Sequence, residues 1–294
     1  MRSRGFLMKV LLTGAGGPAG RALYPQLIAK GVRVTRVDMV PGIGVGQVPA
    51  ARDPLFLKAI SQIIASEGID AIIPTVQEEL PVFARAILPI PVLISSPDAV
   101  DTADDKWLTY HVLNRAGVAT PISSTPESIN TEILEIMGER VISKPRMGRG
   151  GRGVTVHENP HSWELAELPE GIIIQEFAGG VEYAPNVFIS PNRTECVVLQ
   201  KTELAHGIHG NAVSTEVVDD QEIADLAIKA AKTLGIFGPA DVDIRRKDNG
   251  EPVVLEINAR FGANSMKAPI ILEAALESYR DALPHLGVNR EVIV

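Results

Sequence analysis

Short apolar runs and helical patterns alternate through the first hundred residues of this chain. The apolar runs have the length of strands and occupy residues 9–13, 33–37, 71–74 and 92–94. Between them, apolar residues recur with helical spacing at residues 20–30, 54–67 and 79–87. Apolar strands that alternate with helices are typical of a parallel sheet covered on both faces. The pattern therefore predicts an α/β domain of Rossmann-like type over residues 1–100.

The pattern changes near residue 100. A helical segment over residues 104–116 ends at Gly117, and glycine is the usual residue just past a helix end. A strand over residues 141–145 then leads through a glycine-rich loop into a second strand at residues 154–156. Another apolar strand occupies residues 172–177. A second domain is therefore predicted from residue 101 to residue 294.

Two segments near the end of the chain alternate polar and apolar residues. They are joined by Asn249-Gly250, the dipeptide typical of a two-residue hairpin turn, which places Asp243 directly opposite Glu256. Because side chains alternate across a strand, one face carries the polar residues Asp241, Asp243, Glu256, Asn258 and Arg260. The other face is predicted to be core and carries Val242, Ile244, Leu255 and Ile257.

Like charges directly opposite each other on a sheet repel unless a positive charge lies between them. Asp243, Glu256 and the amide oxygen of Asn258 form an all-oxygen set that suits Mg²⁺ or Mn²⁺, which complete their coordination with water and substrate phosphates. The alternative is a solvated face on which Arg245 and Arg260 neutralise the acids. The hairpin therefore predicts either a metal site for a phosphate-bearing ligand or a surface ion-pair network.

The loop over residues 146–153 contains four glycines and three arginines. Its bare N–H groups suit phosphate oxygens, and Arg149 and its neighbours add positive charge. The loop is not a Walker A motif, because no Gly-Lys-Ser/Thr follows and the next element is a strand. An exposed basic linker is the alternative.

The first glycine-rich turn, residues 13–20, together with Asp38 at the end of the second strand, is similar to a dinucleotide-binding turn. The spacing of its glycines resembles that of short-chain reductases, which need a tyrosine with a lysine four residues later. None of the four tyrosines has such a lysine. NAD(P) binding is therefore kept as an alternative rather than as the leading prediction.

Composition narrows the class of protein. The chain has 294 residues, 45% of them hydrophobic, and a formal net charge of −8, which disfavours nucleic acid or an anionic membrane as the main partner. No apolar run approaches the roughly 20 residues of a membrane-spanning helix, and we expect a cytoplasmic protein. The single cysteine, Cys196, permits neither an intrachain disulfide nor a cysteine zinc site.

Taken in order, these segments resemble the ATP-grasp superfamily, most closely the group around the carbamoyl phosphate synthetase large subunit and related stand-alone carboxylate–amine ligases. The resemblance extends over nearly the whole chain and rests on residues 69–80, 105–121, 143–153 and 255–260. It implies a Rossmann-like pre-ATP-grasp domain over residues 1–100. A two-lobed ATP-grasp domain of α+β type would follow over residues 101–294, with a glycine-rich lid at about residues 118–176.

The resemblance also implies roles for individual residues. Those that would contact ATP are Lys106, Lys144, Arg149, Gly150, Gly151, Gln175, Glu176, Phe177, Ala178 and Glu182. Those that would hold Mg²⁺ or Mn²⁺ are Asp243, Glu256 and Asn258. The catalytic residues would be Lys144 and Arg260, with Arg260 facing the transferred phosphoryl group or the carboxylate being activated. The sequence departs from the family at Asn186, where many relatives have Asp, and at Asp243, where the synthetase has Gln.

The implied reaction joins a small-molecule carboxylate to an amine through an acylphosphate, with release of ADP. A free amino acid is the predicted carboxylate. The residues predicted to line the acceptor pocket are His206, His209, Asn264 and Ser265, although the two histidines also fit a solvated loop. The N-terminal domain and a C-terminal helix over residues 270–283 are a candidate homodimer face. An NAD(P)-dependent short-chain oxidoreductase and a non-catalytic nucleotide-binding regulator remain the alternatives.

Overall fold

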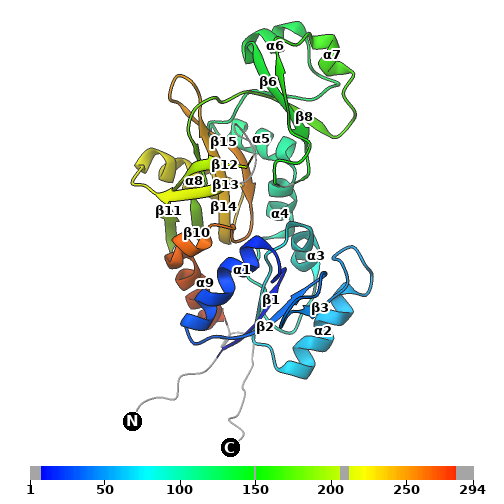
Figure 1. Ribbon diagram of the computed structural model, residues 1–294, viewed down its shortest axis with the longest axis vertical. Helices are drawn as coiled ribbons and strands as arrows, with labels where there is room; N and C mark the ends of the chain where they lie inside the picture. Colours follow the sequence, from blue (N-terminus) through cyan, green and yellow to red (C-terminus); the bar gives the residue numbers. More distant parts are fainter. Residues whose placement is uncertain (1–7, 149, 206–211, 283–294) are drawn as a thin grey trace, which may run out of the picture.

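The computed structural model describes residues 8–148, 150–205 and 212–282. Figure 1 shows three parts along the long axis of the molecule: an N-lobe at one end, a central sheet, and a small lid at the other end. Most segments that carry predicted functional residues belong to the central sheet and the lid. The junction between these two parts is therefore where a site has to form.

The N-lobe is a parallel sheet with helices against it, as the alternating pattern predicts. Its strands are β1 (Lys9–Thr13), β2 (Arg33–Asp38), β3 (Gly46–Gln47) and β4 (Ala71–Ile73), in the order β3-β2-β1-β4. Its helices are α1 (Pro18–Ala29), α2 (Phe56–Glu67) and α3 (Leu80–Arg85). The strand predicted at residues 92–94 is reduced to one parallel bridge between Ile72 and Val92. The Rossmann-like prediction is confirmed.

The glycine-rich turn after β1 is closed by Asp38. The carboxylate of Asp38 accepts hydrogen bonds from the backbone N–H of Gly16 (2.9 Å) and of Val40 (3.0 Å). The side chain that a dinucleotide would need for its ribose is therefore engaged by the turn itself. Gly20 packs so closely that a Cβ there would lie 2.4 Å from the carbonyl oxygen of Gly14, which explains the glycine as a packing requirement.

The central sheet follows the order β11-β10-β14-β9-β12-β13, with β15 paired to β14. Its strands are β9 (Glu182–Tyr183), β10 (Asn186–Ile189), β11 (Thr194–Val197), β12 (Leu199–Leu204), β13 (Ala212–Val217), β14 (Gly238–Arg246) and β15 (Pro252–Asn258). Apolar side chains of the sheet share one core with α4 (Pro97–Asp104), α5 (Lys106–Arg115) and α8 (Gln221–Thr233). The helix predicted over residues 104–116 starts instead at Lys106, because Asp105 caps it.

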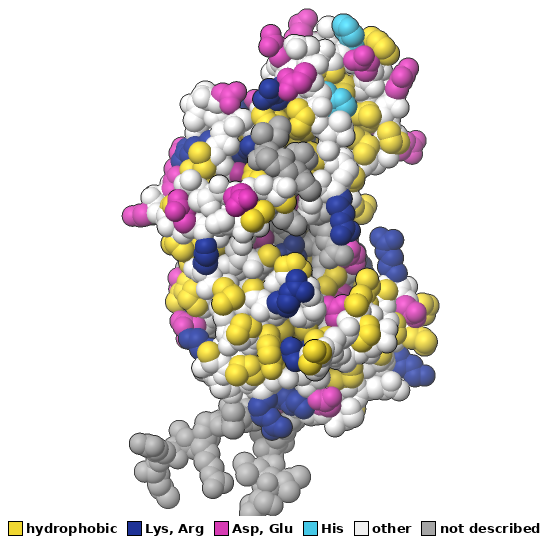
Figure 2. Space-filling model, viewed as in Figure 1, with side chains coloured by type: hydrophobic (Ala, Val, Ile, Leu, Met, Phe, Trp, Pro, Cys, Tyr) yellow, Lys and Arg dark blue, Asp and Glu magenta, His cyan; other side chains and the backbone are white. Residues whose placement is uncertain are grey.

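The lid is an antiparallel sheet with its own small core. Its strands are β5 (Ser123–Ser124), β6 (Arg140–Pro145), β7 (Thr155–Glu158) and β8 (Ile172–Glu176), in the order β5-β8-β6-β7. The helices α6 (Thr131–Met137) and α7 (Ser162–Ala166) accompany it. Figure 2 shows acidic side chains over the outside of the lid. Such a surface does not favour a polyanionic partner.

The C-terminal helix α9 (Pro269–Ala282) returns to the N-lobe and lies beside α1 (Figure 1). Ile271, Leu272 and Ala275 are buried in one core with residues of β1 and α1. The hydroxyl of Tyr279 accepts a hydrogen bond from the N–H of Leu93 (2.6 Å) and donates one to the carbonyl of Ile72. The start and the end of the described chain are therefore packed together.

No helix in the described ranges is long and apolar enough to cross a membrane. Two η turns, Gln77–Glu79 and Ser265–Lys267, complete the elements and flank the N-lobe's junction with the rest of the chain. The parallel N-lobe sheet matches the α/β class predicted for the first part, and the two antiparallel sheets match the α+β class predicted for the second.

Glu79 is a buried carboxyl at the end of the N-lobe sheet. Its Oε2 accepts a hydrogen bond from the hydroxyl of Thr13 at 2.5 Å. Burial raises the pKa of Glu79 to about 7, and the nearby carboxylates of Asp38 and Glu78 add to the effect of burial. The folded state therefore holds a proton on Glu79 across a pH range in which the unfolded chain has released it.

We expect Glu79→Gln to stabilise the protein above neutral pH. Between the ordinary carboxyl pKa and about 7 the folded wild type binds more protons, so its stability falls as the pH rises through that window. The variant escapes this loss, which reaches about 3 kcal/mol at most. Urea unfolding at about pH 5 and about pH 8 measures the difference. Glu78→Gln, at an exposed neighbour, is the matched control, and an equal response of both variants would contradict the assignment.

Candidate active site

The β14–β15 hairpin brings Asp243 and Glu256 opposite each other, as predicted, and pairs Asp241 with Asn258. The predicted two-residue turn is wrong. The turn has three residues, 248–250, closed by hydrogen bonds from Lys247 N to Glu251 O (2.8 Å) and from Gly250 N to Lys247 O (2.9 Å). A bulge after Asp243 restores the register. Two one-residue departures cancel, and the carboxylates meet at the predicted pairing.

The bulge changes which side chains face the core. Val254 is paired with Ile244 and is buried in the core beside Val242 and Ile257. Leu255, which strict alternation assigns to the core, lines a polar cavity instead. The prediction for Leu255 is therefore wrong, because a bulged residue breaks the period of two on which it rests.

Lysines from three separate segments surround the opposed carboxylates. The Nζ of Lys201, on β12, lies 2.6 Å from the Asp243 carboxylate and 2.5 Å from that of Glu182. The Nζ of Lys106, at the start of α5, lies 3.1 Å from Oε2 of Glu256. Lys144, on β6 of the lid, is buried beside the same acids. These ammonium groups supply the positive charge that the opposed carboxylates require.

The charges shift one another's protonation. Burial works to raise the pKa of Glu256, but Lys106 and Lys144 outweigh it and lower that pKa to about 2. Burial lowers the pKa of Lys144 to about 8, against the attraction of Glu256. Burial raises the pKa of Asp243 to about 7, opposed by Lys201. The two opposed carboxylates thus differ in their hold on a proton, and Glu256 is the firmly ionised one.

A cavity of about 120 Å³ lies between the lid and the hairpin. Ile142, Pro145, Val154 and Leu255 give it apolar walls. Its polar lining comes from β6 and the glycine-rich loop, α5 and the central sheet: Lys106, Lys144, Gly148, Gly150, Gly151, Arg152, Glu182, Lys201, Asp243, Arg245 and Glu256. A cavity lined by both apolar and cationic side chains suits a flat aromatic group carrying phosphates.

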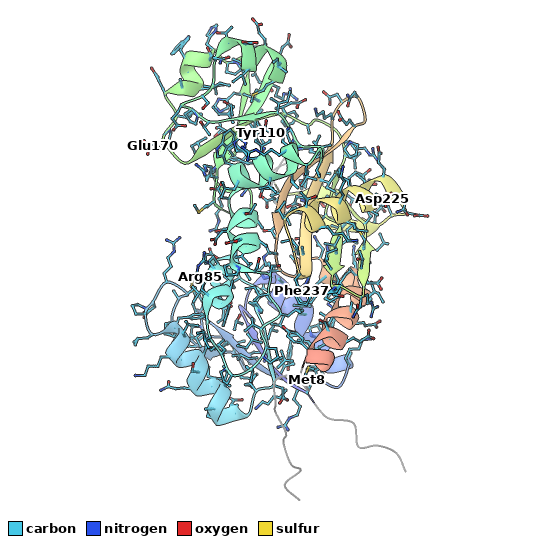
Figure 3. The ribbon with its side chains drawn as sticks, turned by 180° about the vertical axis from the view of Figure 1, so that it is seen from behind. Met8, Arg85, Tyr110, Glu170, Asp225 and Phe237 are labelled. Carbon is cyan, nitrogen blue, oxygen red and sulfur yellow. The ribbon has the colours of Figure 1, made fainter. Side chains whose placement is uncertain are left out.

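The glycine-rich loop is fastened at its base to the start of α5. Asp105 caps α5 by accepting from the N–H of Trp107 (2.9 Å), and it also accepts two hydrogen bonds from Arg146, at 2.5 and 3.1 Å. The Nζ of Lys106 donates to the carbonyl of Gly148 at 3.0 Å. Figure 3, seen from behind, shows α5 with Tyr110 directly beneath the lid. One aspartate therefore sets both the helix start and the root of the loop.

A sequence model of the ATP-grasp domain matches residues 103–264, more than half of the chain. The chain belongs to the ATP-grasp family. The matched range contains the lid, the central sheet and every residue of the cavity described above.

Relatives with curated names support this assignment. A carbamoyl phosphate synthase large chain from Methanobrevibacter smithii is 26% identical over 243 residues, which are 74% of this chain but 23% of that relative. A D-alanine–D-alanine ligase from a Marinomonas species is 29% identical, over 84% of this chain and 81% of the ligase. The chain thus corresponds to under a quarter of the synthase and to most of the smaller ligase. The predicted ATP-grasp family is confirmed, and the second of these relatives is named as a ligase, the enzyme class predicted for this chain.

Solved structures share the fold of this ATP-grasp protein. An L-amino acid ligase from Bacillus licheniformis matches with a TM-score of 0.70 at 19% identity, over 92% of this chain and 74% of that one. A D-alanine–D-alanine ligase from Bacillus anthracis complexed with ATP matches with a TM-score of 0.63 at 16% identity, over 95% of this chain and all of that one. The ATP-grasp fold predicted from sequence is confirmed.

Four of the residues predicted to contact ATP are not among those that line the cavity: Gln175, Glu176, Phe177 and Ala178. Gln175 donates to Ser123 (2.8 Å), and its buried Oε1 has no hydrogen-bond partner within the described chain. Glu176 pairs with Lys247 at 3.0 Å. Phe177 lies between two guanidinium groups, those of Arg140 and Arg245. Ala178 is buried. The free oxygen of Gln175 is the one acceptor in this set that a donor on a ligand would satisfy.

The remaining predicted residues either follow strand β15 or lie outside the described residues. Arg260 donates to Oδ1 of Asn258 at 3.1 Å and lies 3.9 Å from Asp241. Asn264 and Ser265 follow in the chain, and the buried hydroxyl of Ser265 has no hydrogen-bond partner among the described residues. Arg149, His206 and His209 lie outside the described residues.

The donor chemistry of the hairpin fits a hard cation. Asp243 and Glu256 offer carboxylate oxygens and Asn258 an amide oxygen, all from two paired strands. In the described part of the chain, no three His, Cys, Asp or Glu side chains are grouped as a ready metal site. In this structure the ammonium of Lys201 lies between the carboxylates of Glu182 and Asp243, and that of Lys106 is paired with Glu256.

Sequence reasoning missed several residues of the cavity. Lys201, Arg152 and Arg245 supply charge, and Ile142 and Leu255 supply apolar walls. Arg152 belongs to a loop already singled out for phosphate, so the same argument extends to it. Lys201 and Ile142 lie on strands without a motif, and their role follows only from which strands are neighbours.

We expect Asp105→Ala to weaken both the helix cap and the attachment of the glycine-rich loop. Loss of a cap costs about 1 kcal/mol of stability, and the freed Arg146 should lower nucleotide affinity about tenfold. Asn130→Ala is the matched control, because Asn130 caps α6 through Ile133 N–H (2.9 Å) in the lid. Thermal unfolding and calorimetric titration with ATP measure the two effects. Equal nucleotide affinity in both variants would contradict the double role of Asp105.

Proposed function

We propose that this chain is an ATP-dependent carboxylate–amine ligase that forms an acylphosphate and releases ADP and phosphate. The observation that carries the proposal is the pairing of Asp243 with Glu256 beside three lysines, in a cavity that also has apolar walls. A purely structural ion-pair network would need neither a cavity with apolar walls nor a glycine-rich loop beside it. The names of relatives, among them L-amino acid and D-alanine–D-alanine ligases, agree with this reaction class.

The cavity supports one orientation of ATP. The adenine base would lie between Ile142 and Leu255, with Oε1 of Gln175 near its edge. Glu182 would lie toward the ribose. The phosphates would meet Lys106, Lys144 and the N–H groups of Gly150 and Gly151. Arg149 is proposed for the same phosphates. The apolar and the cationic residues of the cavity thus match the base and the phosphates of the nucleotide in kind.

Mg²⁺ or Mn²⁺ is proposed to be held by Asp243, Glu256 and Asn258. Such an ion, when bound, neutralises charge on the β- and γ-phosphates. The low pKa of Glu256, about 2, keeps that ligand ionised throughout the neutral range. Lysines already neutralise Asp243 and Glu256, so an added cation needs further negative charge nearby. The phosphates of ATP would supply it.

This reaction requires the protein to position the substrates and to neutralise charge on the transferring phosphoryl group. It does not require a covalent nucleophile on the protein. A substrate carboxylate oxygen attacks the γ-phosphorus, the bond to the β,γ-bridging oxygen breaks, and ADP leaves. An amine then attacks the acyl carbon of the acylphosphate, phosphate departs, and the amine loses a proton. Lys106, Lys144 and Arg260 stabilise the charge on the transferring group, and the lid keeps out water that would hydrolyse the acylphosphate.

The substrates are proposed to be small molecules, with a free amino acid as the carboxylate. Arg260, Asn264 and the unpartnered hydroxyl of Ser265 follow β15 and are proposed to line the acceptor site, together with His206 and His209. A cytoplasmic location and a homodimer stay predictions. The apolar residues of α9 that are buried against the N-lobe are not available to a partner, so a homodimer would use other surfaces.

We expect Glu256→Gln to abolish Mg-ATP turnover while the fold is retained, because a charged ligand is weakened at constant shape. ADP release is measured with pooled amino acids and amines on the wild type and the variant in parallel. Glu251→Gln, an exposed change on the same hairpin, is the control and should keep full activity.

Pool-dependent ADP release that needs Glu256 would establish the ligase and allow the pool to be divided. Full activity of Glu256→Gln would refute the metal assignment. Clear ATP binding without turnover in any pool would favour the non-catalytic regulator. The oxidoreductase alternative is disfavoured because the chain has an ATP-grasp domain. In addition, the Asp38 carboxylate already accepts a hydrogen bond from its own glycine-rich turn.

A further inference from the structure

Lys201 bridges two carboxylates that the proposed function assigns to different parts of the ligand. Its ammonium lies 2.5 Å from Glu182, proposed for the ribose, and 2.6 Å from Asp243, proposed for the metal ion. The side chain is buried, with 7% of it exposed. It reaches the hairpin from β12, which is separated from β14 by β9. The ammonium therefore stands where a cation bound to Asp243 would have to approach.

The charge of the cavity opposes a second cation. Among the described residues that line it, five are basic and three are acidic. The basic ones are Lys106, Lys144, Arg152, Lys201 and Arg245. A divalent ion added to this excess of positive charge, in a site with little solvent, meets strong repulsion. A triphosphate reverses the sign of the cavity and removes that barrier.

The acidic residues of the cavity are also already paired with basic ones. Glu182 faces Arg245 at 3.6 Å as well as Lys201, and Glu256 faces Lys106. Removing one partner of a buried ion pair leaves an uncompensated charge, which is costly. A free metal ion would have to break these pairs, and the displaced ammonium groups would stay in the cavity beside its charge.

We propose that Lys201 makes metal binding at Asp243 depend on nucleotide, because its ammonium and a divalent cation compete for the same carboxylate until phosphates add negative charge. This inference rests on the proposed function and adds an order of binding to it: nucleotide, or its metal complex, before free metal. Lys201 is thus a residue that sets the selectivity of the site for complexed over free Mg²⁺.

The test uses Mn²⁺ as the probe, because electron paramagnetic resonance reports free Mn²⁺ directly. The wild type should bind Mn²⁺ at least about tenfold more tightly with a non-hydrolysable ATP analogue than without it. Lys201→Met should gain about tenfold or more in affinity for Mn²⁺ alone. Lys201→Arg, which keeps the charge, should behave as the wild type. Lys201→Gln serves as a second variant without the charge if the methionine variant does not fold.

Failure of this inference can be told from failure of the proposed function. A wild type that releases ADP in the assay above, together with Lys201→Met and Lys201→Gln variants that gain no affinity for free Mn²⁺, would overturn only the role of Lys201. Equal Mn²⁺ affinity of the wild type with and without nucleotide would do the same. A wild type that binds the analogue but never Mn²⁺ would overturn the metal assignment and the inference with it.

Discussion

The candidate active site depends on one constraint. Two carboxylates, Asp243 and Glu256, are held opposite each other by the pairing of strands β14 and β15. The ladder does not let them move apart, so their repulsion has to be answered by nearby positive charge. The ammonium groups that answer it come from α5, from the lid and from β12. The lid, helix and sheet are thereby brought to one point by electrostatics as well as by packing.

Packing divides the described molecule in a way that suits a closing lid. The N-lobe and α9 share one apolar core, reinforced by the hydroxyl of Tyr279. The lid has a small core of its own around Val141 and Ile174. Its attachment to α5 runs through the Arg146–Asp105 pair and the contacts of Lys106. A separate core and a polar attachment are the features expected of a part that moves as a unit.

The glycine-rich loop joins these two properties. Gly150, Gly151 and Gly153 adopt positive φ, and a Cβ on Gly153 would lie 3.0 Å from the ring of Pro145. Its base is fixed by Arg146, whereas Gly148, Gly150 and Gly151 line the cavity together with Arg152 and Lys144. A loop of this kind, rich in glycine, can follow a phosphate chain closely.

The sequence by itself determined the order of the elements, the alternating N-lobe, the opposed acids and the glycine-rich loop, because each depends on local periodicity or turn chemistry. It also predicted the carboxylate pairing correctly, although the turn was wrong, since a three-residue turn and a bulge at Leu255 cancel. Only the tertiary structure decided that Leu255 faces the cavity and that Lys201 completes it. A bulge shifts a side chain without a clear local signal, and the neighbours of a strand are fixed by the packing of the whole sheet rather than by its own residues.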